Sequence, residues 1–255
     1  MRLVVAILIG KLVAFLSRRL GMGGGTTLPG TVAQRVDPRV AGNVAAGLRE
    51  GVILVTGTNG KTTTSRLIAR ALQQAGYRVV HNRSGANLLG GVTSALVACS
   101  DWRGRPRADV GLFEVDEATL PIVSEELRPR AVVITNLFRD QLDRYGEVDY
   151  VAGRWREALA RLPVGSAVLL NSDDPVVAGL GNGLPGHAVY FGIEDETYAV
   201  KGKEHTADIR FCTECGGPYD YSVTFYAHLG KYRCRGCGRQ RPAPQVRAAE
   251  QAQKG

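Results

Sequence analysis

The segment from Gly51 to Ala71 limits most strongly what this 255-residue chain can fold into. A short apolar run is followed by a glycine-containing loop and then by apolar residues at helical spacing, which predicts a strand, a turn and a helix. Glycines let backbone N–H groups converge on phosphate oxygens, Lys61 supplies a cation, and the Thr62 hydroxyl can hold Mg²⁺. We therefore interpret the loop as a phosphate-binding P-loop. Its candidate nucleotide-binding residues are Gly57, Thr58, Asn59, Gly60, Lys61, Thr62 and Thr63, with Lys61 also a candidate catalytic residue.

The loop departs from the general Walker pattern at Val55, which stands where that pattern has its first glycine. An ordinary strand-to-helix turn with a chance lysine is the alternative, but strand, Gly-Lys-Thr and amphipathic helix agree in register. The run Thr-Gly-Thr-Asn-Gly-Lys-Thr-Thr, residues 56–63, resembles the loop of the Mur ligases and of relatives such as folylpolyglutamate synthase. That resemblance implies an ATP-dependent, amide-forming ligase.

Composition narrows the partners without choosing one. Aromatic residues are 7% of the chain and charged residues 22%, which suits a soluble α/β protein better than a surface that stacks oligonucleotide bases. The net charge of +8 favours anionic partners, including nucleotides, acidic peptides, nucleic acid and anionic lipid.

Residues 1–48 are predicted to form an N-terminal helix and a glycine-rich segment. The apolar stretch Leu3 to Leu16 is interrupted by Lys11 and is too short to span a bilayer. A packed helix is favoured, with a weak membrane-surface contact as the alternative. Only about 50 residues precede the P-loop, so a full-size substrate domain does not fit there.

Apolar runs that alternate with helical patterns predict a doubly wound, mostly parallel α/β sheet over residues 49–201. A helix around residues 150–162 is expected to pack through Trp155 and Leu159. After the first strand of the P-loop, the expected strands are Tyr77–His81, Asp109–Val115, Ala131–Thr135, Ala167–Leu170 and Ala188–Gly192.

Three carboxylates, Glu114, Asp116 and Glu117, follow or end the third of these strands. Beside a triphosphate they would repel it unless a divalent metal lay between them. Glu114 is the candidate Mg²⁺ ligand together with Thr62, and a candidate catalytic residue, because its place resembles that of the metal-binding glutamate of Mur ligases. A solvated acidic loop that opens a helix is the alternative, and it fits Glu117 better.

Two further strand ends carry candidate ligand-binding residues. For Arg83 and Asn87, after the second strand, a substrate or phosphate role and a plain turn are equally acceptable. Asn171 and Asp174 follow the fifth strand in a run that resembles the Asn-x-Asp-Asp segment beside the adenine of Mur ligases. These residue types also make common turns.

The run from Arg139 to Glu147 resembles the MurT branch of the Mur ligases. Mur ligases usually have a histidine in this segment, and Gln141 replaces it here. An amide oxygen is a weaker ligand than imidazole for most metals, which argues against a direct metal ligand from this loop and leaves the role of Gln141 open.

The most specific metal signal is a pair of Cys-x-x-Cys motifs separated by eighteen residues. Four thiolates at this spacing predict a structural Zn²⁺ in a ribbon inserted at residues 202–241. Two disulfides are the alternative, and arginines near the second pair leave nucleic-acid or partner binding open. The four ligands are Cys212, Cys215, Cys234 and Cys237.

A P-loop core with a late four-cysteine ribbon resembles the MurT-type subunit of lipid II isoglutaminyl synthase over essentially the whole chain. The resemblance implies that ATP phosphorylates the α-carboxylate of D-glutamate in the lipid II stem peptide, in peptidoglycan synthesis. Ammonia from a GatD-type glutaminase partner would then give D-isoglutamine. It implies a cytoplasmic protein, with lipid II reached at the inner face of the membrane.

The resemblance implies a C-terminal ligase domain, whereas residues 242–255 look like a polar tail, so we expect either an incomplete fragment or a remainder that is encoded elsewhere. Two alternatives stay open: a folylpolyglutamate-synthase-like ligase, and a nucleic-acid-binding NTPase that uses the ribbon. For the favoured interpretation no nucleic acid is expected.

Overall fold

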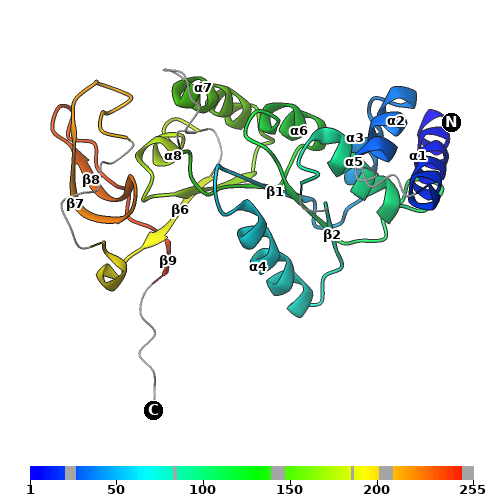
Figure 1. Cartoon of the computed structure of the whole chain (residues 1–255), viewed down its shortest axis with the longest axis horizontal. Helices are drawn as coiled ribbons and strands as arrows, with labels where there is room; N and C mark the ends of the chain where they lie inside the picture. Colours follow the sequence, from blue (N-terminus) through cyan, green and yellow to red (C-terminus); the bar gives the residue numbers. More distant parts are fainter. Residues whose placement is uncertain (21–26, 83–84, 139–146, 185–186, 201–208, 249–255) are drawn as a thin grey trace, which may run out of the picture.

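A computed structural model describes residues 1–20, 27–82, 85–138, 147–184, 187–200 and 209–248. Its centre is a parallel sheet with the strand order β2-β3-β1-β4-β5-β6-β9 (Figure 1). The strands are β1 (Val52–Thr56), β2 (Val79–His81), β3 (Val110–Glu114), β4 (Ala131–Ile134), β5 (Ala167–Asn171), β6 (His187–Ile193) and β9 (Val246–Ala248). The predicted parallel α/β sheet is thus confirmed, and its expected strands are observed within two residues of their expected ends.

Helices cover both faces of the sheet, but unevenly. On one face Val55, Leu112 and Val133 pack against Ile68 and Ala69 of α4. The other face carries the main core, which includes the fully buried Trp155 predicted to pack there. The helices are α1 (Arg2–Arg19), α2 (Leu28–Val36), α3 (Val40–Ala45), α4 (Lys61–Gln74), α5 (Leu89–Cys99), α6 (Leu120–Leu127), α7 (Glu147–Ala160) and α8 (Pro175–Gly179), with a 3-10 turn at Glu196–Tyr198.

The N-terminal helix α1 packs at one end of the molecule on α2 and α5 (Figure 1). Its buried side includes Ile7 and Gly10, and a Cβ at Gly10 would lie 3.1 Å from Val97, so the helices approach closely. The packed helix expected from the sequence is therefore present. Among the helices of the described residues, none is both long and apolar enough to cross a membrane.

The cysteine-containing segment forms an antiparallel hairpin, β7 (Tyr219–Tyr226) with β8 (Leu229–Cys234), at the opposite end of the molecule from α1 (Figure 1). We call residues 209–241 the ribbon. After the ribbon the chain returns to the main sheet, where β9 pairs in parallel with β6. The sequence analysis did not predict β9, because this short strand is exposed and has no apolar pattern. The domain division at residue 241 stays a prediction.

Candidate functional site

The P-loop joins the carboxyl end of β1 to the start of α4. Strand β1 lies between β3 and β4, and the chain crosses from one side of β1 to the other when it passes from β3 to β4. In open parallel sheets, ligands bind outside the carboxyl ends of the strands at such a reversal. The predicted loop therefore lies at the place where this fold class holds its ligands.

Gly57 is required by a close approach between two loops. Its φ is +133°, and a Cβ there would lie 2.2 Å from Thr135 Oγ1 and 2.8 Å from the carbonyl oxygen of Asn136. Contacts this short would force the backbone apart. Any other residue at position 57 would thus displace the P-loop from the loop that follows β4.

Asn136 holds the P-loop in its shape. Its carbonyl oxygen accepts from the N–H of Thr58 at 3.0 Å, and its Oδ1 accepts from the N–H of Asn59 at 2.8 Å. Its Nδ2 donates to Asn59 O at 3.0 Å. The sequence analysis assigned Asn136 no role, although its position directly after a predicted strand was a usable signal.

The N–H groups of the first turn of α4, at Lys61, Thr62 and Thr63, are available to a phosphate, because a helix provides no internal acceptor for them. Lys61 Nζ lies over the loop, 2.5 Å from Gly57 O and 3.4 Å from Glu117 Oε2. The Glu117 carboxylate therefore faces the P-loop lysine as well as preceding α6. Cation and helix start together favour an anion here.

Thr62 and Glu114, which the resemblance to Mur ligases made candidate Mg²⁺ ligands, lie side by side in the structure. Thr62 Oγ1 donates to Glu114 Oε2 at 2.8 Å, and Glu114 is only 1% exposed. A buried Asn82 holds the end of β3: its Oδ1 accepts from Glu114 N and its Nδ2 donates to Glu114 O, both at 2.9 Å. Asn82 was missed from the sequence, although it follows the predicted second strand directly.

The residues around Glu114 fit a divalent cation. Glu114 Oε1 and His81 Nε2 are 3.8 Å apart, and both are buried atoms that lack a hydrogen-bond partner within the described ranges. A carboxylate oxygen and a threonine hydroxyl are hard oxygen ligands of the kind that Mg²⁺ prefers. Thr62 and Glu114 line a groove of about 500 Å³, which His81 and Asn82 also line. Glu114 Oε1 accepts no hydrogen bond in the described residues and is therefore available as a ligand, with His81 Nε2 as a neighbour at 3.8 Å.

Asn171 and Asp174 lie near the loop that follows β4 and contacts the P-loop, but their side chains already form hydrogen bonds within the protein. Asn171 Nδ2 donates to Thr135 O at 2.8 Å. Asp174, which is 0% exposed, caps α8 through Oδ1 and accepts from the N–H of Leu137 through Oδ2 at 2.8 Å. Both side chains support strand-end loops, and their contact with adenine stays a prediction.

Of the two open candidates after β2, Asn87 accepts the Asp116 N–H through its carbonyl oxygen at 3.2 Å, as a turn residue would. Arg83 lies outside the described residues. So does Gln141, with the rest of the run 139–146.

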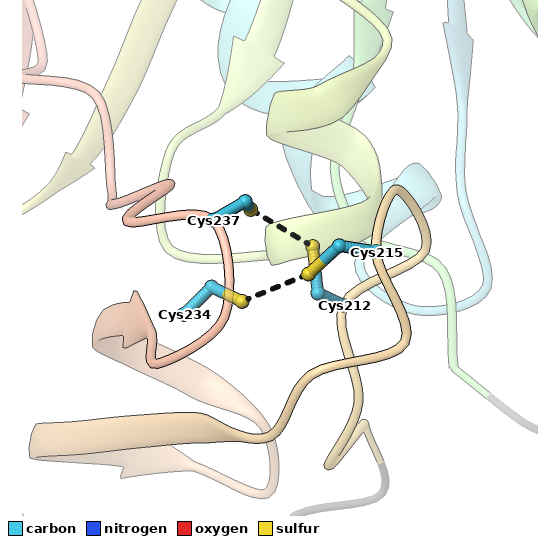
Figure 2. A group of neighbouring side chains, drawn as sticks. All are labelled: Cys212, Cys215, Cys234 and Cys237. Atoms are coloured by element: carbon cyan, nitrogen blue, oxygen red, sulfur yellow. Dashed lines mark hydrogen bonds between the residues drawn. The ribbon is translucent and has the colours of Figure 1, made fainter.

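The four ribbon cysteines converge. Their sulfur atoms all lie within 4.8 Å of one another, and the side chains of the two pairs point toward each other (Figure 2). Cys212 Sγ is 3.8 Å from Cys237 Sγ, and Cys215 Sγ is 3.4 Å from Cys234 Sγ, distances that exclude disulfides in this structure. Four sulfur donors at this separation fit a closed tetrahedral metal site.

The surroundings of two of the four cysteines favour thiolates, whereas at Cys215 a hydrogen bond from the Gly217 backbone lowers the pKa but hydrogen bonds with Cys234 and Cys237 raise it to about 11. Burial alone would raise the pKa of the Cys212 thiol, but hydrogen bonds, including those from the backbone N–H groups of Glu214 and Cys215, lower it to about 6. A hydrogen bond from the Cys237 backbone lowers the pKa of Cys234. Thiolates are the form that binds metal.

Comparison with known proteins identifies the family. The model of the Mur ligase middle domain matches residues 55–228. The chain belongs to the Mur ligase family. This Mur ligase chain is 36% identical over 94% of its length to the MurT subunit of the glutamine-hydrolysing lipid II isoglutaminyl synthase of Staphylococcus aureus strain N315, and 35% identical over 93% to that of Streptococcus pneumoniae strain ATCC BAA-255 / R6. It spans 53% and 51% of these relatives, about half of their length.

Solved structures agree on the fold of this Mur ligase chain. MurF from Acinetobacter baumannii aligns with a TM-score of 0.52 at 19% identity, over 65% of this chain and 35% of that one. MurF from Thermotoga maritima, solved in complex with ADP, aligns with a TM-score of 0.51 at 17% identity, over 63% and 36%. The predicted Mur-type α/β fold is thereby confirmed.

Proposed function

We propose that this chain binds Mg·ATP at residues 57–63 as the ATP-binding part of an amide-forming ligase. The observation that carries the proposal is the Thr62–Glu114 contact of 2.8 Å, which brings a hydroxyl and a buried carboxylate with a free oxygen to the mouth of the P-loop. Membership of the Mur ligase family supports it.

The chain's own residues can stabilise a phosphoryl group in transfer. The Lys61 ammonium and the first-turn N–H groups of α4 would face the negative charge on the phosphate oxygens. Thr62 and Glu114 would hold Mg²⁺, which neutralises phosphate charge when it is bound. Gly57 and Asn136 keep the loop in the shape that these contacts need.

We propose that the acceptor is the α-carboxylate of D-glutamate in the lipid II stem peptide. The carboxylate would attack the γ-phosphorus to form an acyl phosphate and release ADP; ammonia would then attack the acyl carbon and displace phosphate, leaving D-isoglutamine. The support is similarity to relatives named as subunits of a glutamine-hydrolysing lipid II isoglutaminyl synthase. Those relatives are called subunits, which supports a partner; we propose that this partner is the GatD-type glutaminase that the sequence resemblance implies, and that it supplies the ammonia.

The ribbon cysteines are proposed to hold one structural Zn²⁺. Four protein thiolates leave no open coordination position, so the metal would organise the fold and take no part in hydrolysis. A small apolar cluster around Tyr219 and Tyr232 packs beside the cysteines, and it alone is too small to stabilise a ribbon.

We propose a cytoplasmic location at the inner face of the membrane. The outward face of α1 carries Val5, Leu8, Leu12 and Phe15, which are 45–56% exposed, and α1 ends in Arg18 and Arg19. An apolar stripe with terminal arginines suits the surface of an anionic bilayer. Sedimentation with anionic but not neutral vesicles, lost in Leu12→Glu, would support this location.

The nucleic-acid alternative loses support from the pairing of the ribbon arginines. Arg235 pairs with Asp220, Arg239 with Glu214 at 3.0 Å, and Arg241 with Asp173 at 2.6 Å. Arginines that already contact carboxylates offer less charge to a phosphate backbone.

The proposed function is tested by combining this chain with a segment that supplies the rest of its relatives' length and with a glutaminase. ATP-dependent conversion of the lipid II carboxylate to an amide, followed by mass spectrometry, should depend on glutamine and be lost in Lys61→Ala. Amidation that persists in this variant would contradict the assigned nucleotide site.

A further inference from the structure

The tip of the ribbon hairpin is buried against the P-loop domain. His228, in the turn between β7 and β8, is 0% exposed, although it belongs to a small peripheral element. The next bond along the hairpin is also to the core, because Gly230 N donates to Asp173 O at 2.9 Å. Ala227 adopts a φ of +48°, a conformation that alanine rarely takes. The turn is therefore held in shape by its docking.

His228 contacts Asp174, the residue that supports the loop after β4. Its Nε2 lies 3.1 Å from Asp174 Oδ2, the same oxygen that accepts the N–H of Leu137 at 2.8 Å. The His228 ring also packs on Phe138, with 4.6 Å between ring centroids. His228 thus contacts the loop after β4 directly, through the Phe138 ring, and indirectly, through the Asp174 carboxylate that accepts from Leu137.

The same loop shapes the P-loop on its other side. Phe138 N donates to Thr58 Oγ1 at 3.0 Å, and Asn136 accepts the N–H groups of Thr58 and Asn59. The contacts therefore run without a break from His228 through Asp174 and the segment 136–138 to Thr58. No described helix lies between the tip of the ribbon and residues 136–138, which contact the P-loop.

We propose that His228 is a positioning residue that couples the ribbon to nucleotide affinity. By holding Asp174 and Phe138, it fixes residues 136–138 and, through them, the P-loop in its binding shape; a preorganised loop loses less entropy when it binds phosphate. The proposal rests on the proposed Mg·ATP site. It assigns the ribbon a function beyond its own metal: an intact ribbon would be needed for full nucleotide affinity.

A matched pair of variants tests this in the full chain. His228→Leu keeps most of the buried volume and loses the bond to Asp174, whereas His228→Gln can still donate to it. We expect His228→Leu to weaken Mg·ATP binding in calorimetry by roughly three- to thirtyfold, the usual range for residues that couple two sites, and His228→Gln to stay within about twofold. Zinc content by mass spectrometry should be unchanged in both.

The double variant with Thr58→Ala separates positioning from general destabilisation. If His228 acts through residues 136–138, the losses of Mg·ATP affinity in His228→Leu and in Thr58→Ala do not multiply in the double variant, because both substitutions remove the same support. Multiplying losses would overturn the proposal. If His228→Leu does not fold, hydrogen exchange of the Thr58 and Asn59 amides serves instead. These amides should exchange at the same rate in His228→Gln as in the wild type, and faster in the wild type after zinc is removed. An exchange rate that zinc removal leaves unchanged would overturn the proposal.

The controls distinguish the two proposals. Ser222→Ala, on the exposed side of the hairpin, should leave Mg·ATP affinity unchanged. If Lys61→Ala abolishes binding but His228→Leu binds like the wild type, the nucleotide site stands and the coupling is wrong. A wild-type chain without Mg·ATP affinity would overturn both.

Discussion

The Thr62 hydroxyl donates a 2.8 Å hydrogen bond to Glu114 Oε2 and thereby joins the first turn of α4 to the end of β3. The other oxygen of the same carboxylate is buried and has no hydrogen-bond partner in the described part of the chain. A carboxylate held by one bond, with a free oxygen beside a P-loop, is arranged for a cation.

Glu114→Gln should weaken Mg-dependent ATP binding by at least roughly tenfold, because an amide oxygen is a poorer ligand than a carboxylate oxygen for a hard cation. Binding without Mg²⁺ should change much less. Calorimetry with and without Mg²⁺ measures both. Glu117→Gln, which removes only the ion pair with Lys61, is the matched control. Equal losses with and without Mg²⁺ would point to a structural role for Glu114.

Lys61→Ala should lower affinity for ATP by at least roughly tenfold, since a hydrogen bond to a charged group contributes about 1.5–3 kcal/mol. The thermal unfolding temperature should hardly move, because the Nζ contacts are to loop carbonyls and to one carboxylate. Unchanged affinity would remove Lys61 from the proposed site.

Asn82→Ala should lower the free energy of unfolding by about 2 kcal/mol or more, because it leaves buried groups of Glu114 and Ala86 unpaired. Urea denaturation measures this change. Asn87→Ala is the control, since its side-chain contact with Asn82 is long, at 3.5 Å. If both variants unfold at the same urea concentration, the Asn82 bonds add nothing to stability.

Cys234→Ser should remove or greatly weaken the bound metal that native mass spectrometry is expected to show at one per wild-type chain. Because thiolates must lose their protons to bind zinc, the metal should be released as the pH falls. Proteolysis within the ribbon should then increase, and Mg·ATP affinity should fall by the same factor as in His228→Leu. A metal-free protein with a protease-resistant ribbon would contradict the zinc site.

Local patterns in the sequence were sufficient for the strands, the P-loop and the four cysteines. A P-loop is recognisable because its glycines, lysine and threonine are neighbours, and the paired cysteines are recognisable because each pair forms one turn. The resemblance to Mur ligases also made Thr62 and Glu114 candidate ligands of one ion, but their contact depends on β1 lying beside β3, which only the tertiary structure shows.

Only the tertiary structure decided which polar residues support those motifs. Asn136 bonds to Asn59 across 77 positions, and His228 contacts Asp174 across 54. Asparagine and aspartate are common in turns whatever they contact, and a single histidine has no local pattern, so their partners cannot be identified until the sheet order brings the loops together. Strand β9 was missed for the same reason: its place in the sheet depends on pairing with β6, because its own residues carry no apolar pattern.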